Sequence, residues 1–360
     1  MGLLSMMPGL LNMKRPSFVI LFVTARCNAR CSFCFYGDNV RDASLSEELT
    51  AEEYSLISKS AGKVPYLLLS GGEPVLRDDL ADIIGYFVEN ASSRFVTVPS
   101  NGLSPERTRT LFESLTSRYP QTHFRASFSV DYADDRHDEL RGVKGCLESL
   151  KYSAGLISDL RERRDNLSMD VVTVFMGQSA HDLGEVRDFA LRELKPNNHE
   201  LHLLRPDGPG GAPDGIDVDL FLRELHIFGE RARSSETRRL SSLFRGINNT
   251  FLSAMPRLCR GAWIAPCRAG TKFTVVDELG NVRLCEIRDE VLGNLRDCGY
   301  DLISLLRSVD ARRTVREMNR EKCTCTWECA MSTNVIYSPR FLPGILLRTI
   351  LELFTRRSPQ

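Results

Sequence analysis

Three cysteines close to the N-terminus constrain this chain more than any other feature. Cys27, Cys31 and Cys34 lie within eight residues, in the run Cys-Asn-Ala-Arg-Cys-Ser-Phe-Cys. Three thiolates at this spacing can hold three irons of a [4Fe–4S] cluster and leave the fourth iron without a protein ligand. A structural zinc site is the alternative, but such sites usually take four ligands with paired C-x2-C spacing. The run therefore predicts a cluster with one iron open to a substrate.

Composition narrows the class of protein. At 360 residues and 42% hydrophobic, the chain can bury the core of a main domain with an appendage. Lys plus Arg and Asp plus Glu number 47 each, which disfavours nucleic acid as a partner. Eight of the 11 cysteines fall in two tight groups, a pattern typical of metal ligation in a reducing compartment. We therefore expect a cytoplasmic location.

Membrane insertion is not expected from the sequence. No apolar run approaches the roughly 20 residues that a transmembrane helix needs. The apolar segment 1–13 lacks the basic leader and the small-residue cleavage site of a signal peptide. Any membrane contact would be peripheral, at the inner membrane face.

Short β-rich runs alternate with helical patterns, which is typical of βα units around a parallel sheet. Strands are predicted at 17–24, 66–70, 95–99, 123–130, 169–175 and 200–204. Helices are predicted at 50–60, 78–89, 105–118, 136–160 and 180–194, the first opened by a capping box from Thr50 to Glu53. Chemistry in such folds lies at the carboxyl ends of the strands, and the motifs of this chain follow strands one, two, three and four.

The C-x3-C-x2-C run, with an aromatic residue before its last cysteine, resembles the radical S-adenosylmethionine (SAM) enzymes. The resemblance implies that SAM chelates the open iron and that an electron from the cluster splits it into methionine and a 5′-deoxyadenosyl radical. It also implies an α/β fold, an open (β/α)6 partial barrel similar to a TIM barrel. The run Gly71-Gly72-Glu73-Pro74 resembles the GGEP motif of the family, whose backbone and glutamate accept hydrogen bonds from the SAM amino group.

A further stretch resembles the SPASM/twitch branch of these enzymes. Ser129 and Asp131 close strand four and are followed by His-Asp-Glu-Leu-Arg141. In relatives, the serine contacts the SAM ribose or carboxylate and the arginine pairs with the carboxylate, and we expect these roles for Ser129 and Arg141. A helix-capping serine and a surface arginine are the alternatives. Asp131 is expected to cap a helix or to touch substrate. Asn101 is expected to face the ribose hydroxyls or, alternatively, to form the turn before Gly102.

The second cysteine group resembles the twitch or SPASM domain, which carries auxiliary [4Fe–4S] clusters. Its five members are Cys267, Cys285, Cys323, Cys325 and Cys329. This number suffices for one auxiliary cluster, ligated by Cys267, Cys285 and two of the other three, with a zinc site as the alternative. A fully ligated cluster excludes direct substrate binding, so electron transfer or support of the fold is the expected role.

The motifs divide the chain into four parts. We expect the barrel at 14–215, a helical bridge at 216–257, a small cysteine-rich α+β domain at 258–334 and an amphipathic C-terminal helix at 335–360. Two short strands are predicted in the small domain, at 272–276 and 281–285. The loop 207–215, rich in glycine and proline, is expected to be a turn and linker or to line the substrate mouth. The isolated cysteines are predicted to be buried small hydrophobic residues: Cys146, Cys259 and Cys298.

These features predict a radical SAM enzyme that cleaves SAM reductively and abstracts hydrogen from an organic substrate. Peptide or protein modification is the favoured reaction class, and a lipid, an isoprenoid or a small metabolite is the alternative substrate. A non-catalytic iron–sulfur redox sensor is the alternative from another class, but it would not need Glu73 and Arg141 beside three intact cysteines. The expected partner is an electron donor such as flavodoxin or ferredoxin. The C-terminal helix is expected to pack against its own domain, with contact to a membrane surface as the alternative. The sequence identifies no catalytic residue on the substrate side.

Overall fold

A nine-stranded sheet organises the chain in the computed structural model, which describes residues 15–41, 47–230 and 238–355. The strand order is β6-β5-β4-β3-β2-β1-β7-β8-β9, and β1 to β6 run parallel to one another. These six are β1 (Phe18–Thr24), β2 (Tyr66–Gly71), β3 (Phe95–Ser100), β4 (His123–Ser129), β5 (Leu167–Phe175) and β6 (Asn198–Leu203). The expected parallel α/β architecture is confirmed.

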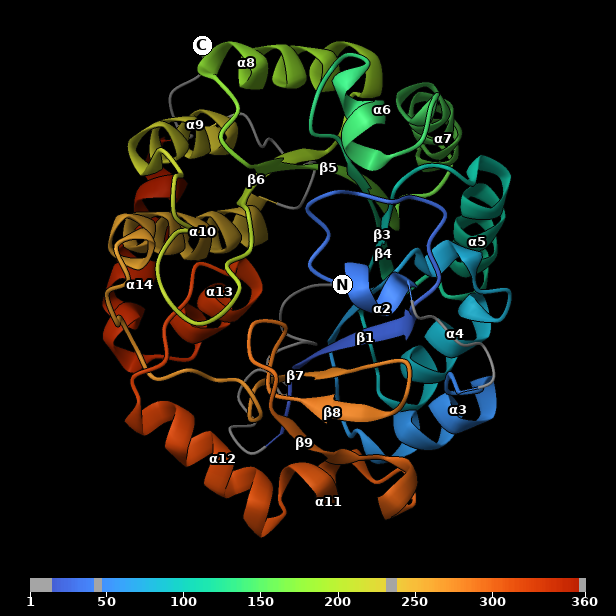
Figure 1. The fold of residues 1–360 in the computed structure, drawn as a ribbon, viewed down its shortest axis with the longest axis vertical. Helices are drawn as coiled ribbons and strands as arrows, with labels where there is room; N and C mark the ends of the chain where they lie inside the picture. The colour runs from blue at the N-terminus through green and yellow to red at the C-terminus, as the bar shows by residue number, and fades with distance from the viewer. Residues whose placement is uncertain (1–14, 42–46, 231–237, 356–360) are drawn as a thin grey trace.

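Helices on one side of the sheet close the outer core (Figure 1). They are α3 (Ala51–Ser60), α4 (Leu80–Asn90), α5 (Pro105–Arg118), α7 (Cys146–Arg161) and α8 (Ala180–Phe189), the last continued by a π-helical turn (Ala190–Leu194). The predicted capping box of α3 is confirmed, because the Thr50 hydroxyl accepts from Glu53 N and the Glu53 carboxylate accepts from Thr50 N. The reciprocal bonds explain why the helix starts where the sequence predicts.

The prediction of a single helix at 136–160 is wrong. The segment forms α6 (Arg136–Arg141) and α7, separated at Gly142, which has a φ of 65° and lies in the left-handed region. A Cβ at this glycine would lie 3.0 Å from the carbonyl oxygen of Arg30. The break therefore lets the end of α6 approach the loop that carries the first three cysteines.

The C-terminal part of the chain extends the sheet of the barrel. Strand β7 (Phe273–Val276) pairs with β1 in parallel, and β8 (Asn281–Arg283) and β9 (Val291–Asn294) follow in antiparallel order. The predicted hairpin is therefore not a separate sheet, because it covers the edge of β1 that would otherwise be open. The helices of this part are α9 (Val218–Glu230), α10 (Arg238–Cys259), α11 (Leu302–Leu306), α12 (Val309–Arg320), α13 (Glu328–Ile336) and α14 (Leu342–Thr355).

Strand β1 separates two hydrophobic cores. All seven of its residues are buried, as expected for a central strand with both faces covered. Val19, Leu21 and Val23 belong to the core shared with the outer helices. Phe18, Ile20 and Phe22 belong to a second core, to which α9, α10 and α13 contribute. Within the described residues, no helix is long and apolar enough to cross a membrane.

The turn after β2 lies against the backbone that follows β1. Gly72 N donates to Thr24 O at 2.8 Å, and Glu73 N donates to Arg26 O at 2.8 Å. A Cβ on Gly72 would lie 2.1 Å from Arg26 O, a distance that real structures do not allow. Glycine is therefore needed here because one backbone approaches another, and this requirement comes before any contact with a ligand.

We expect Gly72→Ala to lower the free energy of unfolding by about 2–3 kcal/mol, because the backbone must shift to relieve the clash. Gly155→Ala is the matched control, since that glycine lies within α7 and its Cβ would meet nothing within 4 Å. This control should gain about 0.5–1 kcal/mol through helix propensity. Chemical denaturation followed by circular dichroism measures both, and equal stabilities for the two variants would contradict the steric argument.

Candidate SAM and iron–sulfur sites

The three N-terminal cysteines come together in a loop directly after β1. Each thiol is half-buried, and no disulfide joins them. Burial raises the pKa of Cys27 to about 11, with the charges of Glu73, Cys31 and Cys34 adding to the effect. Burial also raises the pKa of Cys34, to which Cys31 contributes. Three neighbouring thiols of this kind suit a metal cluster, which takes up thiolates and releases their protons.

The ends of neighbouring elements hold this loop in place. Arg30 N donates to Arg141 O at 2.9 Å and Ser32 N donates to Leu140 O at 3.2 Å, so the last turn of α6 pairs with the loop. The Arg30 guanidinium donates to the carbonyl of Cys27 at 2.7 Å. The loop has no regular secondary structure, and these contacts, together with a turn of its own from Cys34 N to Cys31 O at 3.3 Å, satisfy part of its backbone.

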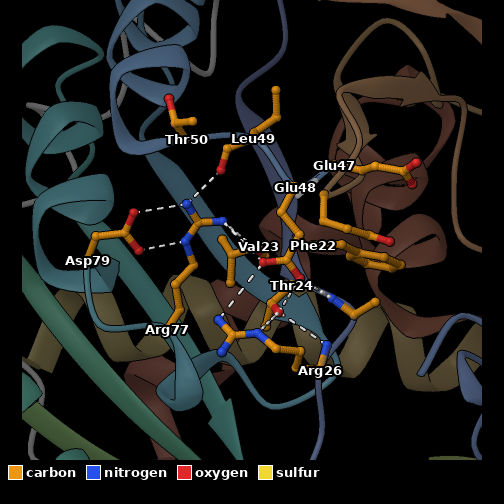
Figure 2. A network of polar contacts seen from close by, with 12 residues as sticks. Phe22, Val23, Thr24, Arg26, Glu47, Glu48, Leu49, Thr50, Arg77 and Asp79 are labelled. Atoms are coloured by element: carbon orange, nitrogen blue, oxygen red, sulfur yellow. Dashed lines mark hydrogen bonds and ion pairs between the residues drawn. The ribbon is translucent and has the colours of Figure 1, made fainter. Parts of the chain in front are cut away.

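Glu48 anchors the start of the loop (Figure 2). Its carboxylate accepts from the Thr24 hydroxyl and from Ala25 N, the latter at 3.1 Å. The guanidinium groups of Arg26 and Arg77 each lie 3.9 Å from its other oxygen. Arg77 also donates to the carbonyls of Val23 and Leu49 and pairs with Asp79. The two arginines offset the cost of burying the carboxylate, and the network fixes where β1 ends.

A second anchor joins the loop to the C-terminal part of the chain. Tyr36, two residues after Cys34, donates its hydroxyl to Glu278 in the turn between β7 and β8. Glu278 is buried, and burial raises the pKa of its carboxyl group. Its carbonyl accepts from Leu49 N at 2.6 Å, next to Glu48. Glu48 thus holds the start of the cysteine loop and Glu278 holds its end.

Glu73 of the GGEP motif is 2% exposed and connects the ends of β2 and β3. Its carboxylate accepts from Asn101 N at 2.7 Å and from Val75 N at 3.4 Å. Burial raises its pKa to about 7, although these hydrogen bonds and the charge of Arg141 act in the opposite direction. Pro74 opens a short 3-10 turn (Pro74–Leu76) and is buried.

Asn101 follows β3 and contacts the cysteine loop. Its side-chain amide donates to Asn28 Oδ1 at 2.8 Å and lies 3.8 Å from the sulfur of Cys27. Its Oδ1 accepts from Leu103 N at 2.9 Å, the bond expected of a turn-forming asparagine. The side chain therefore forms the turn and also orients Cys27.

Arg141 is buried beside Cys31, so the surface arginine considered as an alternative is wrong. One guanidinium nitrogen lies 3.7 Å from the Cys31 sulfur, and another pairs with Asp131. Its Nε is buried without a hydrogen-bond partner among the described residues. Asp131 also accepts from Val174 N at 3.0 Å, and α6 begins after Asp135, so the expectation that Asp131 caps a helix is wrong, whereas its contact with substrate stays a prediction. It positions Arg141.

Ser129 is the last residue of β4 and is half-buried. Helix α6 begins after Asp135, so Ser129 does not cap it. In the described part of the chain its hydroxyl makes no side-chain hydrogen bond within the protein. The structure thus places Ser129 at the strand end as expected, at the edge of the sheet where the cysteine loop lies.

Four of the five C-terminal cysteines form one group. Cys267 lies before β7, Cys285 after β8, and Cys323 and Cys325 between α12 and α13. Burial raises the pKa of Cys325 well above its ordinary value, and the charges of the other three add to this effect. Burial, with smaller contributions from the charges of Cys267 and Cys323, raises the pKa of Cys285 to about 12. No three His, Cys, Asp or Glu side chains of the described residues could together hold a single metal ion.

Cys329 lies apart from this group. It is on the first turn of α13, and the neighbouring charges that act on its pKa are those of Arg205, Glu328 and Glu200. Burial raises the pKa of this thiol to about 12. The choice among the last three cysteines stays a prediction, and the mutual influence of Cys323 and Cys325 with Cys267 and Cys285 favours these two.

Ionisable side chains, which the sequence analysis did not identify, line the inner face of the sheet. Arg125 of β4 pairs with Asp170 of β5 at 3.1 Å, and His202 of β6 pairs with Glu200 at 3.0 Å and lies 4.0 Å from Glu328. Burial alone would lower the pKa of His202, but Glu328 and Glu200 outweigh it and raise the pKa to about 8. The two-residue alternation along β6 is the sequence signal that places Glu200 and His202 on one face.

These groups are deep in the protein and still reached by solvent. The side chains of Arg125, Glu200 and His202 are 36%, 37% and 30% exposed. Burial nevertheless is the largest influence on the pKa of both Glu200 and His202. They therefore face space inside the fold rather than a packed core.

The loop that begins at Asp207 lines a hollow of about 650 Å³, and the other walls of this hollow include Arg288 and Cys323. This places the loop beside the second cysteine group.

Cys146 and Cys259 are buried as predicted, whereas Cys298 is exposed, so the prediction for Cys298 is wrong. It follows a chain reversal at the surface after β9, where no core is available to cover it.

Comparison with known proteins identifies the family. Residues 21–190 match the sequence profile of the Radical SAM superfamily. The chain is 27% identical to an AdoMet-dependent heme synthase of Methanosarcina barkeri over 86% of this chain and 87% of that protein. It is also 27% identical to an Fe-coproporphyrin III synthase of the same organism, over 59% of this chain and 49% of that protein.

Solved structures share the fold. The enzyme anSMEcpe with bound AdoMet and Kp18Cys peptide has a TM-score of 0.60 at 14% identity, covering 95% of this chain and 99% of that one. Streptococcus suis SuiB bound to S-adenosylmethionine has a TM-score of 0.57 at 17% identity, covering 85% of this chain and 68% of that one. With the cysteine loop at the carboxyl end of β1, the profile match identifies residues 21–190 as a radical SAM domain, the kind of domain that uses a [4Fe–4S] cluster and SAM.

Proposed function

We propose that this chain cleaves SAM reductively at the cysteine loop and removes a hydrogen atom from an organic substrate on the inner face of the sheet. The observation that carries this proposal is the meeting of Cys27, Cys31 and Cys34 with Glu73 and Arg141 at one edge of the sheet. When bound, the cluster supplies the electron that splits SAM into methionine and a 5′-deoxyadenosyl radical. The protein residues hold the nucleotide, orient it and exclude water.

Specific side chains suit the groups of SAM. Arg141 is held by Asp131, and its unpartnered Nε can donate to the SAM carboxylate. Ser129 offers a hydroxyl for the ribose or the carboxylate. Glu73 complements the SAM amino group, whose positive charge would favour the ionised carboxylate. The expected contact of Asn101 with the SAM ribose stays a prediction. In the structure its side-chain oxygen accepts the hydrogen bond of the turn, and its side-chain nitrogen lies near the Cys27 sulfur.

The second cysteine group is proposed to ligate one auxiliary [4Fe–4S] cluster within a SPASM/twitch-like region. Four thiols, Cys267, Cys285, Cys323 and Cys325, act on one another electrostatically and would ligate all four irons. No iron would then be open to substrate, so electron transfer or support of the fold is the proposed role. An electron donor such as flavodoxin or ferredoxin is the expected partner for the cluster chemistry.

Alanine variants separate the two sites after anaerobic reconstitution with iron and sulfide. Cys31→Ala should abolish formation of 5′-deoxyadenosine, whereas Cys285→Ala should retain SAM cleavage and lose about four of about eight irons. Cys329→Ala is the matched control and should keep about eight irons. Iron analysis and chromatography of the nucleoside measure both results. A full iron content in Cys285→Ala would contradict the auxiliary site, and absence of the nucleoside from wild-type protein would favour the non-catalytic sensor.

The charges on the inner face bear on the substrate class. Asp170, Glu200 and Glu328 supply three carboxylates, against the two cations of Arg125 and His202. Such a mixed and slightly acidic face suits a peptide or protein side chain, whose polar groups carry little net charge or a positive one. We therefore favour peptide or protein modification. An iron tetrapyrrole is the second candidate, because two relatives in the sequence comparison are a heme synthase and an Fe-coproporphyrin III synthase.

Fe-coproporphyrin III tests these two classes directly. Because its four carboxylates match the inner face poorly, we expect it to leave the rate of 5′-deoxyadenosine formation unchanged in reduced, reconstituted enzyme with SAM. Mass spectrometry of the porphyrin in the same sample should show no change. A stimulated rate together with a porphyrin of altered mass would replace the peptide proposal by the tetrapyrrole one.

Helix α14 is proposed to contact a membrane surface. One face of the helix packs on α10, where Glu352 pairs with Arg245 at 2.7 Å and Arg348 donates to Thr250 at 3.1 Å. The opposite face exposes large apolar side chains, with Leu346 at 60% and Leu347 at 59%. The other exposed members are Leu342, Ile350 and Leu351. A helix held rigidly with such a face outward suits the interface of a bilayer, and it keeps a lipid substrate open as an alternative. The apolar segment 1–13 lies outside the described residues.

We expect the double variant Leu346→Ser/Leu350→Ser to bind anionic liposomes about tenfold more weakly than the wild type, because it loses buried apolar area at the interface. Leu56→Ser/Leu191→Ser is the matched control, since both residues are exposed on other helices and should not affect binding. Co-sedimentation measures the bound fraction. Equal binding by the two double variants would contradict the proposal, as would wild-type protein that stays in the supernatant.

A further inference from the structure

Arg205 lies between the two cysteine groups. It follows β6 by two residues, at the edge of the sheet where the strands end and the first cysteine loop lies. The preceding residue, Leu204, still continues the pairing of the sheet, because its N–H donates to Phe175 O at 3.0 Å. The backbone of Arg205 is therefore held by the barrel itself rather than by a free loop.

On one side, Arg205 contacts the loop of the SAM cluster. Its guanidinium carbon lies 3.9 Å from the ring centroid of Phe35, the residue directly after Cys34. Its positive charge interacts electrostatically with the sulfur of Cys34. Phe35 is 46% exposed, which is unusual for a large aromatic side chain, so the stacked pair borders open space between the two sites.

On the other side, Arg205 contacts the auxiliary group. It pairs with Glu286, the residue directly after Cys285, whose side chain is 1% exposed. Its guanidinium carbon also lies 5.3 Å from the ring of Trp327, two residues after Cys325. Its charge interacts most with the sulfur of Cys329 and, less strongly, with those of Cys285 and Cys325.

The arrangement is stronger than an ordinary ion pair. Burying Glu286 is costly unless its partner is fixed, and two aromatic rings restrict the planar guanidinium. A lysine would pair with the carboxylate but could not stack in the same way. The protein thus places one rigid cation beside both sets of thiolates.

We propose that Arg205 is a positioning residue that joins the two cluster loops and, by its positive charge, raises the reduction potential of both clusters. The proposal rests on the auxiliary cluster proposed above. Adding an electron makes a cluster more negative, so a nearby fixed cation stabilises the reduced form. The residue contacts both cysteine loops, so its charge would act on either cluster when that cluster is bound.

Three variants of the full-length, reconstituted protein test this role by redox titration monitored by electron paramagnetic resonance. Arg205→Gln should shift both midpoint potentials to more negative values, the auxiliary one more. Arg205→Lys keeps the charge and should restore most of the shift. Arg288→Gln is the matched control, because Arg288 interacts with Cys323 from the side of the hollow and should shift the auxiliary potential alone.

The outcomes separate this inference from the proposed function. Wild-type protein with about four irons would remove the auxiliary cluster and this inference with it. About eight irons in all variants, with potentials unchanged in Arg205→Gln, would overturn only the role of Arg205. The same shift in the Lys and Gln variants would also overturn it, because the charge would then not be the cause. Circular dichroism and iron content check that Arg205→Gln folds, and if it does not, Arg205→Lys against wild type gives the comparison.

Discussion

The site depends on one constraint, which is that a loop without secondary structure must hold three thiols in a fixed geometry. Turns within the loop satisfy only some of its backbone groups, so others bond to the ends of neighbouring elements. The turn after β2 contacts Arg26, the last turn of α6 contacts Arg30, and the buried Glu48 carboxylate holds Ala25. Positions that are set by three separate elements of a rigid barrel are more accurate than any loop could set by itself. The GGEP glycine at 72 belongs to this support, because a side chain there would push the loop away.

The second cysteine group is fixed to the same strand. Because β7 pairs with β1, the turn after β7 carries Glu278 up to Tyr36, next to the first cysteine group. The aromatic side chains of β1 pack from the inner face against the elements that carry the second group. The distance between the two groups is therefore set by one continuous sheet and one shared core. A hinge between separate domains would leave that distance variable.

Much of the fold follows from sequence patterns, and the misses have identifiable causes. Buried parallel strands are short apolar runs, so β1 to β6 were predictable within one or two residues. The break at Gly142 was not, because the helical pattern continues across it and only the proximity of Arg30 explains the glycine. Cysteine spacing gave the two groups but left open which of the last three cysteines join. That choice depends on how the segment after α12 folds back, which local sequence does not encode. Asp131 was misread because a strand-end aspartate usually caps a helix, whereas here it pairs with Arg141.

Charge compensation links the two sites and explains why arginines recur around them. Burial keeps the free thiols protonated, as the raised pKa values of Cys27 and Cys285 indicate. Loading a cluster replaces those protons by metal and leaves net negative charge in a poorly hydrated place. The chain meets each such charge with a guanidinium that cannot lose its proton: Arg141 beside Cys31, and Arg205 between the two groups. A neutral polar residue at either position could hold the loops but could not offset the charge. The arginines thus suit cysteine groups that carry clusters, the second of which is the auxiliary cluster that we propose.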